Sequence, residues 1–480
     1  VAREQIFVAM DELLKAQCSS RPLVVIFDDM QWCDESSAAA LHYLLRMNKD
    51  QPLAVMIGAR QEELRENIPM QQALRGLRGE GMAHDIVLEP LATEVTEALI
   101  SREVPQVDAV RLAADSVGNP LLALELARAE AAGDSSGSLA DLIHDRLSRL
   151  DDAATEIVLW SSVLAPGINM QALQAVTGLA QDQLESGLEA VQAQNMLLPS
   201  HRGFSFFHDL ITRAVYDQLG PARQKSMHHR VASYLEIESA LDLERASDMA
   251  HHAEKSGDPA LAARAMLSAG RLCLRYYAND DALSLAQSGL QFAGKLPDTE
   301  RICLTLELSE VQFSAAPVAQ WEAEAERYVE LAEEALDHGA IPAARLGYHL
   351  ASSLRWMHGD WRLARADTLQ AERVSRGATD EEHILGTAET AKCLALLERD
   401  LLQADAMAME AQALSTRKRI TCPALAEASG ILRYYEGKYE QAEEALLDAR
   451  AQSKVQGDRI AEYQANDYLF MLNIERSEQN

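Results

Sequence analysis

Two adjacent carboxylates, Asp28 and Asp29, are the side chains of this sequence best placed to do chemistry. They directly follow Leu23 to Phe27, a continuous apolar run typical of a parallel strand covered on both faces. Open α/β sheets bind their ligands at the carboxyl ends of such strands. In nucleoside triphosphatases, one acid at this position holds Mg²⁺ and its neighbour can polarise the attacking water. The pair therefore predicts a Mg²⁺-dependent nucleotide site.

Helix capping is the alternative interpretation of the acid pair. A helix is expected to begin shortly after it, and Asp34, Ser36 and Ser37 already supply oxygens that can cap that helix. Acids several residues before a helix are seldom needed as caps. The nucleotide interpretation is therefore favoured.

The wider segment around the acid pair carries a family resemblance. The sequence RPLVVIFDDMQWCDESS, from Arg21 to Ser37, precedes an expected helix at Ala38 to Met47 and a second apolar strand at Leu53 to Gly58. This order resembles the Walker B segment of STAND-type AAA ATPases, in particular that of the large ATP-binding LuxR-type transcriptional regulators related to the maltose regulator. Related ATPase modules also accompany nucleotide cyclases and protein kinases.

Four later segments follow in the order of that family. Ala59-Arg60 resembles its sensor position, Leu88 to Leu91 its junction from strand to lid, Gly118 to Leu126 its GNP-containing lid helix, and Phe206 to Tyr216 its winged-helix segment. Agreement of four segments in family order is not expected by chance.

The resemblance implies a role for each candidate site residue. ATP and Mg²⁺ would lie between the α/β core and the lid. Asp28 would coordinate Mg²⁺, Asp29 would orient or polarise the hydrolytic water, and Arg60 would sense the γ-phosphate. Pro120 would lie against the adenine, and His208 would reach the β-phosphate of ADP and hold the closed state.

Two of these residues have structural alternatives. Pro120 could simply be a proline at the first position of a helix. His208 could pack beside Asp209, whose charge favours the positive end of a helix.

A phosphate-binding P-loop is missing from the sequence. No G-x-x-x-x-G-K-[ST] occurs in the 480 residues, and the 22 residues before Leu23 hold one expected amphipathic helix, with Ile6, Met10, Leu13 and Leu14 on one face. Because the chain also begins with Val, we expect a fragment of a longer protein that has Walker A upstream. A literally translated alternative start codon would instead indicate a genuinely P-loop-less relative. Either way, we expect weak ATP binding and negligible turnover from this chain.

Composition indicates a helical, multidomain, cytoplasmic protein. A length of 480 residues suggests about three or four domains. No apolar run of about 18 residues and no secretory signal pattern occurs, so no membrane span is expected. The six cysteines are far apart and are expected to be reduced. A net charge of −30 opposes nucleic-acid binding, so DNA contact would need a C-terminal helix-turn-helix that is not visible here.

The predicted fold class is mainly α with a partial α/β P-loop NTPase core. The predicted regions are the C-terminal half of the ATPase core at 1–90, a helical lid at 91–151, a winged helix at 152–240 and an α-solenoid of TPR-like repeats at 241–480. A strand is expected near Asp85 to Leu88, and a linker at Gly133 to Gly137. The expected winged helix has helices at 153–164, 170–176 and 182–194, followed by a hairpin at 196–207.

The repeat prediction depends on four alanines, each five positions after a turn. Ala282, Ala364, Ala404 and Ala442 are 82, 40 and 38 residues apart, so the first gap fits two units. A small residue there permits close contact between paired helices. Most aromatic residues of this region are then expected in the interhelical core, with a ligand-binding surface as the alternative: Trp321, Trp356, Trp361, Tyr434, Tyr435 and Tyr439.

The combined hypothesis is an ATP-dependent signalling switch whose repeats bind an inducer or a protein partner, with ligand-driven oligomerisation as one outcome. The alternatives are a non-catalytic repeat scaffold with a degenerate ATPase remnant, and a regulatory module of a cyclase or kinase. No nucleophilic triad stands out. The adjacent pairs His228-His229 and His251-His252 are poor shared metal sites, because neighbours on a helix point in different directions.

Overall fold

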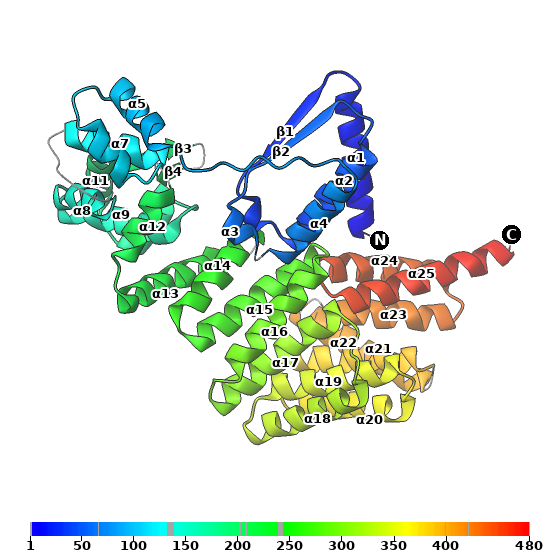
Figure 1. Ribbon diagram of the computed structural model, residues 1–480. Coiled ribbons are helices and arrows are strands. Elements are labelled where there is room, and N and C mark those ends of the chain that lie inside the picture. The colour runs from blue at the N-terminus through cyan, green and yellow to red at the C-terminus, as the bar shows by residue number, and fades with distance from the viewer. Residues whose placement is uncertain are drawn as a thin grey trace. The chain divides into compact units, whose positions relative to one another are not determined.

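The chain is mainly helical and divides into two units, residues 1–131 and 132–480 (Figure 1). The computed structural model describes residues 2–65, 67–131, 139–194, 196–200, 203–206, 209–238, 243–398, 400–420 and 422–479. The predicted linker at Gly133 to Gly137 lies outside these residues. Within them, no helix is both long and apolar enough to cross a membrane. The six cysteines are free.

The first unit contains a parallel pair of strands, β1 (Leu23–Phe27) and β2 (Leu53–Ile57), in which Leu23 lies opposite Leu53. Helices α2 (Glu35–Met47) and α4 (Ile68–Gly79) pack against Val55 and Ile57 on one face. The predicted cover on both faces is wrong for the described residues. Val24, Ile26 and Met56 are 58%, 69% and 57% exposed, because α2 and α4 lie on the other face.

Helix α1 (Ala2–Cys18) forms as predicted, but its apolar face is not buried. Ile6, Met10 and Leu13 are 55%, 42% and 61% exposed. A polar contact attaches the helix instead. The buried Asp11 carboxylate accepts hydrogen bonds from Asn48 Nδ2 at 2.7 Å and from Lys15 Nζ at 2.6 Å.

The strand predicted near Asp85 to Leu88 is absent. These residues are extended but unpaired, and Ile86 and Leu88 are 84% and 89% exposed. Asp85 accepts two hydrogen bonds from the Arg78 guanidinium, each 2.8 Å long. An apolar sequence therefore did not produce a strand here, because no neighbouring strand pairs with its backbone.

Three helices complete the first unit. They are α5 (Thr93–Glu103), α6 (Ala109–Asp115) and α7 (Pro120–Ala131), and they enclose Ile100, Leu112 and Leu126. Two short helices, η1 (Met30–Trp32) and α3 (Gln61–Leu64), lie beside the strands.

The second unit begins with helices and an antiparallel hairpin, as predicted. Its elements are α8 (Leu139–Ser148), α9 (Asp152–Leu164), α10 (Met170–Thr177), α11 (Gln181–Ala193), β3 (Leu197–Ser200), β4 (Gly203–Phe206), α12 (Asp209–Asp217) and α13 (Pro221–Glu238). They share one core, centred on α9 with Ile157, Val158 and Leu173 fully buried.

Repeated antiparallel helices form the rest of this unit. They are α14 (Leu243–Ser256), α15 (Pro259–Arg275), α16 (Asn279–Ala293), α17 (Asp298–Ala315), α18 (Trp321–Asp337), α19 (Ile341–Met357), α20 (Trp361–Ser375), α21 (Asp380–Leu396), α22 (Leu401–Lys418), α23 (Pro423–Tyr435), α24 (Tyr439–Gln456) and α25 (Arg459–Gln479). The alanines Ala282, Ala364, Ala404 and Ala442 are each 0% exposed, which confirms their predicted place between helices. Ala325, also 0% exposed, fills the long gap.

The aromatic residues divide between the core and the surface. Tyr434, Tyr435 and Tyr439 pack against the core of the last repeats, and Trp321 packs against that of α17 to α19, as predicted. Trp361 is 55% exposed, so its predicted burial is wrong. Its position at the first turn of α20 places it beyond the interhelical contact.

The repeat array returns on itself, so that α24 contacts α15 and α25 contacts α17 (Figure 1). Tyr277, in the turn after α15, donates a hydrogen bond to Glu462 Oε1 at 2.9 Å. The Arg459 guanidinium lies 3.5 Å from the centre of the same tyrosine ring. Gly457 approaches α15 so closely that an added Cβ would lie 3.2 Å from Arg271 O. An early and a late repeat are therefore joined directly.

Candidate functional site

The acid pair lies at the carboxyl edge of the two parallel strands, as the sequence predicts. Gly58 N, after β2, donates a hydrogen bond to Phe27 O at 2.8 Å, and Met30 N donates one to Gly58 O at 3.0 Å. A Cβ on Gly58 would lie 2.4 Å from Asp28 Oδ1, so a side chain there would displace that carboxylate. The strand ends therefore present Asp28 and Asp29 side by side.

A buried amide, Gln31, connects the acid pair to Arg60. Gln31 is 4% exposed; its Nε2 donates to Asp29 Oδ1 at 2.8 Å, and its Oε1 accepts a hydrogen bond from Arg60 N at 3.1 Å. Asn67 Nδ2 fixes the same loop by donating to Gln31 O at 3.0 Å. Both strand ends therefore share one hydrogen-bonded network. Sequence reasoning missed Gln31, although an amide between apolar Met30 and Trp32 is a signal for such a buried polar contact.

The capping interpretation of the acid pair is wrong. Asp34 alone caps α2, because its carboxylate accepts hydrogen bonds from Ser37 N at 2.9 Å and Ser37 Oγ at 2.6 Å. Asp29 instead adopts a left-handed backbone conformation, with φ of 54°, before η1 and makes no side-chain cap. Aspartate tolerates this conformation better than most residues, and Asp400 adopts it in the same way before α22.

The Arg60 side chain lies on the surface beside the same edge. Its Nη1 is 3.3 Å from Glu63 Oε1, and its guanidinium lies 5.4 Å from the centre of the Trp32 ring. The structure thus brings together Asp28, Asp29 and Arg60. The Gln31 contact reaches the backbone N of Arg60, whereas the guanidinium contacts Glu63 and Trp32. A guanidinium at the same sheet edge as two carboxylates can contact a phosphate whose metal ion the carboxylates hold.

The lid segments named by the resemblance also meet. Leu91 N donates a hydrogen bond to Gly118 O at 2.9 Å, and a Cβ on Gly118 would lie 2.4 Å from Leu91 O. Asn119 Oδ1 caps α7 by accepting hydrogen bonds from the backbone of Leu121 and Leu122. Pro120 is exposed at the first position of α7, as its structural alternative states. The contacts among Asp28, Asp29 and Arg60 do not include it.

The predicted phosphate contact of His208 lies outside the described residues. The neighbouring elements, β4 and α12, are present as predicted. Within the part of the chain that the structure describes, no group of three or more His, Cys, Asp or Glu side chains is arranged to hold a metal ion.

The two histidine pairs meet in a contact that the sequence did not predict. His228 Nδ1 on α13 and His252 Nδ1 on α14 lie 2.8 Å apart, and Tyr216 Oη lies 2.9 Å from His228 Nε2. Burial lowers the pKa of His228 to about 4 and that of His252 to about 3. One imidazole must accept the hydrogen bond, so the two cannot both be protonated there.

Comparisons with known proteins leave the family of this chain open. No protein-family model matches it, and no curated protein matches it. Among solved structures, it is similar to the crystal structure of a Signal Transduction ATPase with Numerous Domains (STAND) protein with a tetratricopeptide repeat sensor from Pyrococcus horikoshii. The identity is 14%, the TM-score is 0.47, and the match covers 98% of this chain and 72% of that chain. We therefore base the function on the contacts of this chain's own residues.

Proposed function

We propose that this chain is the nucleotide-controlled switch of a STAND-type ATPase that resembles the LuxR-type transcriptional regulators. The observation that carries the proposal is the Gln31 contact, which joins Asp29 to Arg60 across the carboxyl edge of two parallel strands. Open α/β sheets bind ligands at this edge. The repeats would bind an inducer or protein partner and shift the populations of the two nucleotide states by differential affinity.

The donor set fits a magnesium nucleotide in part. Asp28 Oδ1 and Asp29 Oδ1 already accept hydrogen bonds within the loop, and the second oxygen of each carboxylate is available to a hard cation. Mg²⁺, when bound, would offset the charge of the ATP phosphates. Asp28 would hold the ion, Asp29 would orient water, and Arg60 would contact the γ-phosphate. The phosphate cradle of a P-loop has no counterpart in the sequence.

The remaining contacts of the proposal come from the resemblance. Pro120 would lie against the adenine, and His208, in a winged helix formed by residues 152–240, would reach the β-phosphate of ADP. Contact with DNA would need a separate basic helix-turn-helix, because a net charge of −30 opposes binding to phosphates. Hydrolysis would be slow and would reset the switch.

A second candidate function is a repeat scaffold in which the first unit is a structural remnant. Two observations favour it: the sequence has no P-loop motif, and the sheet leaves Val24, Ile26 and Met56 exposed on one face. In this candidate, the network around Gln31 would only stabilise the loop after β1.

Binding of Mn²⁺ with ATP distinguishes the two candidates. Electron paramagnetic resonance would measure bound Mn²⁺ at high protein concentration with and without ATP, in the wild type, Asp28→Asn and Asp29→Asn. Asp34→Asn is the matched control, since it changes an acid of the same loop whose role is capping. We expect weak ATP-dependent Mn²⁺ binding that falls by roughly tenfold or more in the two site variants, since even supporting contacts to metals have such effects.

One result would count against the proposal, and another would count against our expectation of negligible turnover. Equal Mn²⁺ binding by the wild type and both site variants would favour the scaffold. Rapid Mg²⁺-dependent ATP hydrolysis that disappears in Asp29→Ala would show that this chain needs no P-loop, contrary to our expectation of negligible turnover.

A further inference from the structure

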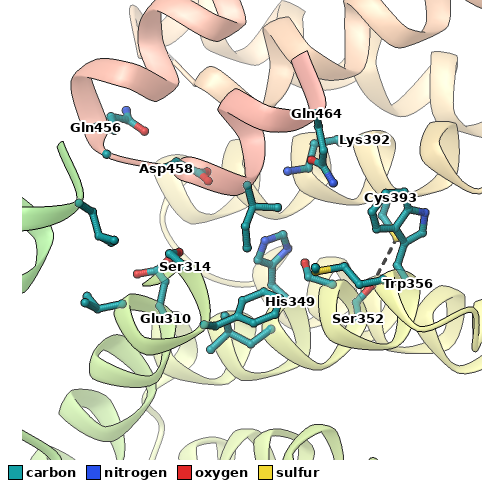
Figure 2. A pocket seen from close by; sticks show the side chains of 18 of the residues that line it. Glu310, Ser314, His349, Ser352, Trp356, Lys392, Cys393, Gln456, Asp458 and Gln464 are labelled. Atoms are coloured by element: carbon teal, nitrogen blue, oxygen red, sulfur yellow. Dashed lines mark hydrogen bonds between the residues drawn. The ribbon is translucent and has the colours of Figure 1, made fainter. Parts of the chain in front are cut away.

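The repeat array of the second unit contains a partly open cavity of about 340 Å³ (Figure 2). Its walls come from α15, α17, α19, α21 and the turn between α24 and α25. Pockets for small molecules have volumes of roughly 300–1,000 Å³, so this cavity suits a small metabolite. One part of the wall is apolar and includes Phe313, Leu350 and Trp356.

Three hydrogen-bond acceptors face the same space from two sides. Figure 2 shows Glu310 on α17, with Asp458 and Gln464 on the C-terminal segment. Gln464 is 7% exposed, and its Oε1 accepts no hydrogen bond from the described residues. A buried amide oxygen without a donor costs about 1–3 kcal/mol, which indicates that a donor is supplied from elsewhere.

The Asp458 carboxylate makes no ion pair within 4.0 Å among the described residues, although it is near enough to Lys392 to raise the pKa of that ammonium group. Its Oδ1 accepts a hydrogen bond from Ala461 N at 3.0 Å at the start of α25. Asp458 is nevertheless close enough to raise the pKa of Glu310, which burial raises first. Glu310 has 40% of its side-chain surface exposed, and its Oε2 lies 3.2 Å from Arg271 Nη2. Two carboxylates that repel each other thus line the same cavity.

The buried cations around the cavity are already paired with carboxylates. Arg345 lies between Glu382 and Glu389, at 2.8 Å and 2.6 Å. Lys392 Nζ lies 3.4 Å from Glu427 Oε2, which is almost fully buried.

The other basic groups of the wall are Arg271, His349 and Arg275, of which Arg271 pairs with Glu307 and Glu310. His349 is held neutral, since burial lowers its pKa. Arg275, which also lines the cavity, is exposed. Asp458 is therefore a carboxylate of the wall without an ion pair among the described residues, and Gln464 Oε1 is an acceptor without a donor there.

We infer that this cavity binds a small organic cation, whose protonated amine is held by Asp458, Glu310 and Gln464 Oε1 and whose apolar body packs against Trp356 and Leu350. A charge-assisted hydrogen bond from an amine would satisfy the orphan oxygen and separate the two carboxylates. The inference rests on the proposed function in one respect, that the repeats are the sensing part of the switch.

Such a ligand would act as a bridge within the array. Asp458 and Gln464 belong to the last helices, whereas Glu310 and Trp356 belong to α17 and α19. The contact of Tyr277 with Glu462 joins the same two parts at the edge of the array. Binding in the cavity would therefore favour the closed arrangement of the repeats, which is the change that a sensor needs.

Calorimetric titration without nucleotide tests the inference, using three probe pairs: tyramine with tyrosol, phenethylamine with phenylethanol, and butylamine with butanol. In each pair, the first compound carries a protonated amine where the second carries a hydroxyl group. We expect at least one amine to bind about tenfold or more tightly than its alcohol, as loss of a charged hydrogen bond implies. Asp458→Asn keeps a side chain that can cap α25 and should remove this preference. Glu310→Gln, a second variant, should weaken it.

Asp448→Asn is the control, because it removes an exposed acid of α24 outside the cavity. It should leave amine binding unchanged. The inference is overturned if no amine binds more tightly than its alcohol, if the preference survives in both site variants, or if 4-hydroxyphenylacetate binds more tightly than tyramine. Because no nucleotide is present, these results do not depend on Asp28 or Asp29. Failure of the manganese experiment would leave them unaffected.

Discussion

Acidification from pH 7 to pH 5 should loosen the contact between α13 and α14 through one buried histidine pair. His228 and His252 are 3% and 6% exposed, with their Nδ1 atoms 2.8 Å apart. Tyr216 Oη contacts His228, and Lys255 and His251 add positive charge nearby. Burial and these cations all disfavour an imidazolium. Protonation of both rings would also break the hydrogen bond between them.

The expected magnitude follows from the two pKa values. An ordinary histidine has a pKa of 6.5, whereas the folded values are about 4 for His228 and about 3 for His252. Below pH 6.5 the unfolded chain binds more protons, so stability is fully present above that pH and is lost as the pH falls toward 4. Each histidine contributes about 1.4 kcal/mol per pH unit in this window. The loss at pH 5 is about 2 kcal/mol for one ring and about 2–4 kcal/mol for the coupled pair.

Hydrogen exchange of the α13 and α14 amides, corrected for intrinsic rates, would measure the local free energy of opening from pH 5 to pH 8. The perturbed protein is the double variant His228→Gln and His252→Gln, compared with the wild type. His338→Gln changes an exposed histidine of the same unit and serves as the control. We expect the free energy of opening of the wild type, relative to that of the double variant, to fall by about 2–4 kcal/mol between pH 7 and pH 5.

The comparison with the variant is needed because Glu427 works in the opposite direction. Burial raises its pKa to about 7, so its contribution to stability is lost as the pH rises toward that value. The reasoning about the histidine pair is refuted if the free energy of opening has the same pH dependence in the wild type and the double variant. It is also refuted if His338→Gln alone abolishes the pH dependence seen in the wild type.

Two further changes test the packing of each unit. Gly118→Ala places a Cβ 2.4 Å from Leu91 O at a φ of +76°, whereas Gly81→Ala meets only open space at a φ of +70°. Both variants carry the left-handed backbone strain of about 1–2 kcal/mol. The clash should make Gly118→Ala lower the free energy of unfolding by at least about 1 kcal/mol more than Gly81→Ala, measured by hydrogen exchange of α5 and α7. Equal losses of stability would contradict the close approach of Gly118 to Leu91. Lys392→Met leaves the carboxylate of Glu427, which is 1% exposed, without its partner, and should cost about 3–5 kcal/mol in urea denaturation. The double variant Lys392→Met with Glu427→Leu should recover most of that loss of stability. If Lys392→Met alone is within about 1 kcal/mol of the wild type, the ion pair is not needed for stability.

The part of the site that follows from backbone geometry could be predicted from the sequence. Parallel strands place their carboxyl ends at one edge, so the apolar run before Asp28-Asp29 was enough to predict where that pair lies. The position of Arg60 after the second strand came from the family resemblance. Gln31 could not be found in this way, because its role depends on two partners that are close only in the folded chain. The histidine contact is similar: each adjacent pair points in two directions, and only the packing of α13 on α14 selects His228 and His252.

The repeats show where local signals succeed and fail. Ala282, Ala364, Ala404 and Ala442 each follow a turn with recognisable residues, and all are buried as predicted. Ala325 was missed because residues 316–320, before it, have no such turn signal.

The error near Asp85 to Leu88 has the opposite cause. Ile86 to Leu88 is an apolar run of the kind that forms strands, but a strand exists only when a neighbour accepts its hydrogen bonds. The local sequence indicates that a segment prefers the strand conformation, but it does not show whether a neighbouring strand is present to pair with it.

The direct contact between Tyr277 and the last helix also affects how the repeats unfold. In an open array of repeats, each unit depends on its immediate neighbours, and the ends fray independently. Here the loss of α25 would leave Tyr277, 185 residues before Glu462, without the carboxylate that accepts its hydrogen bond and without the guanidinium of Arg459 on its ring. The C-terminal repeats should therefore melt cooperatively with α15 and α16, as a closed ring does, rather than peel away one at a time.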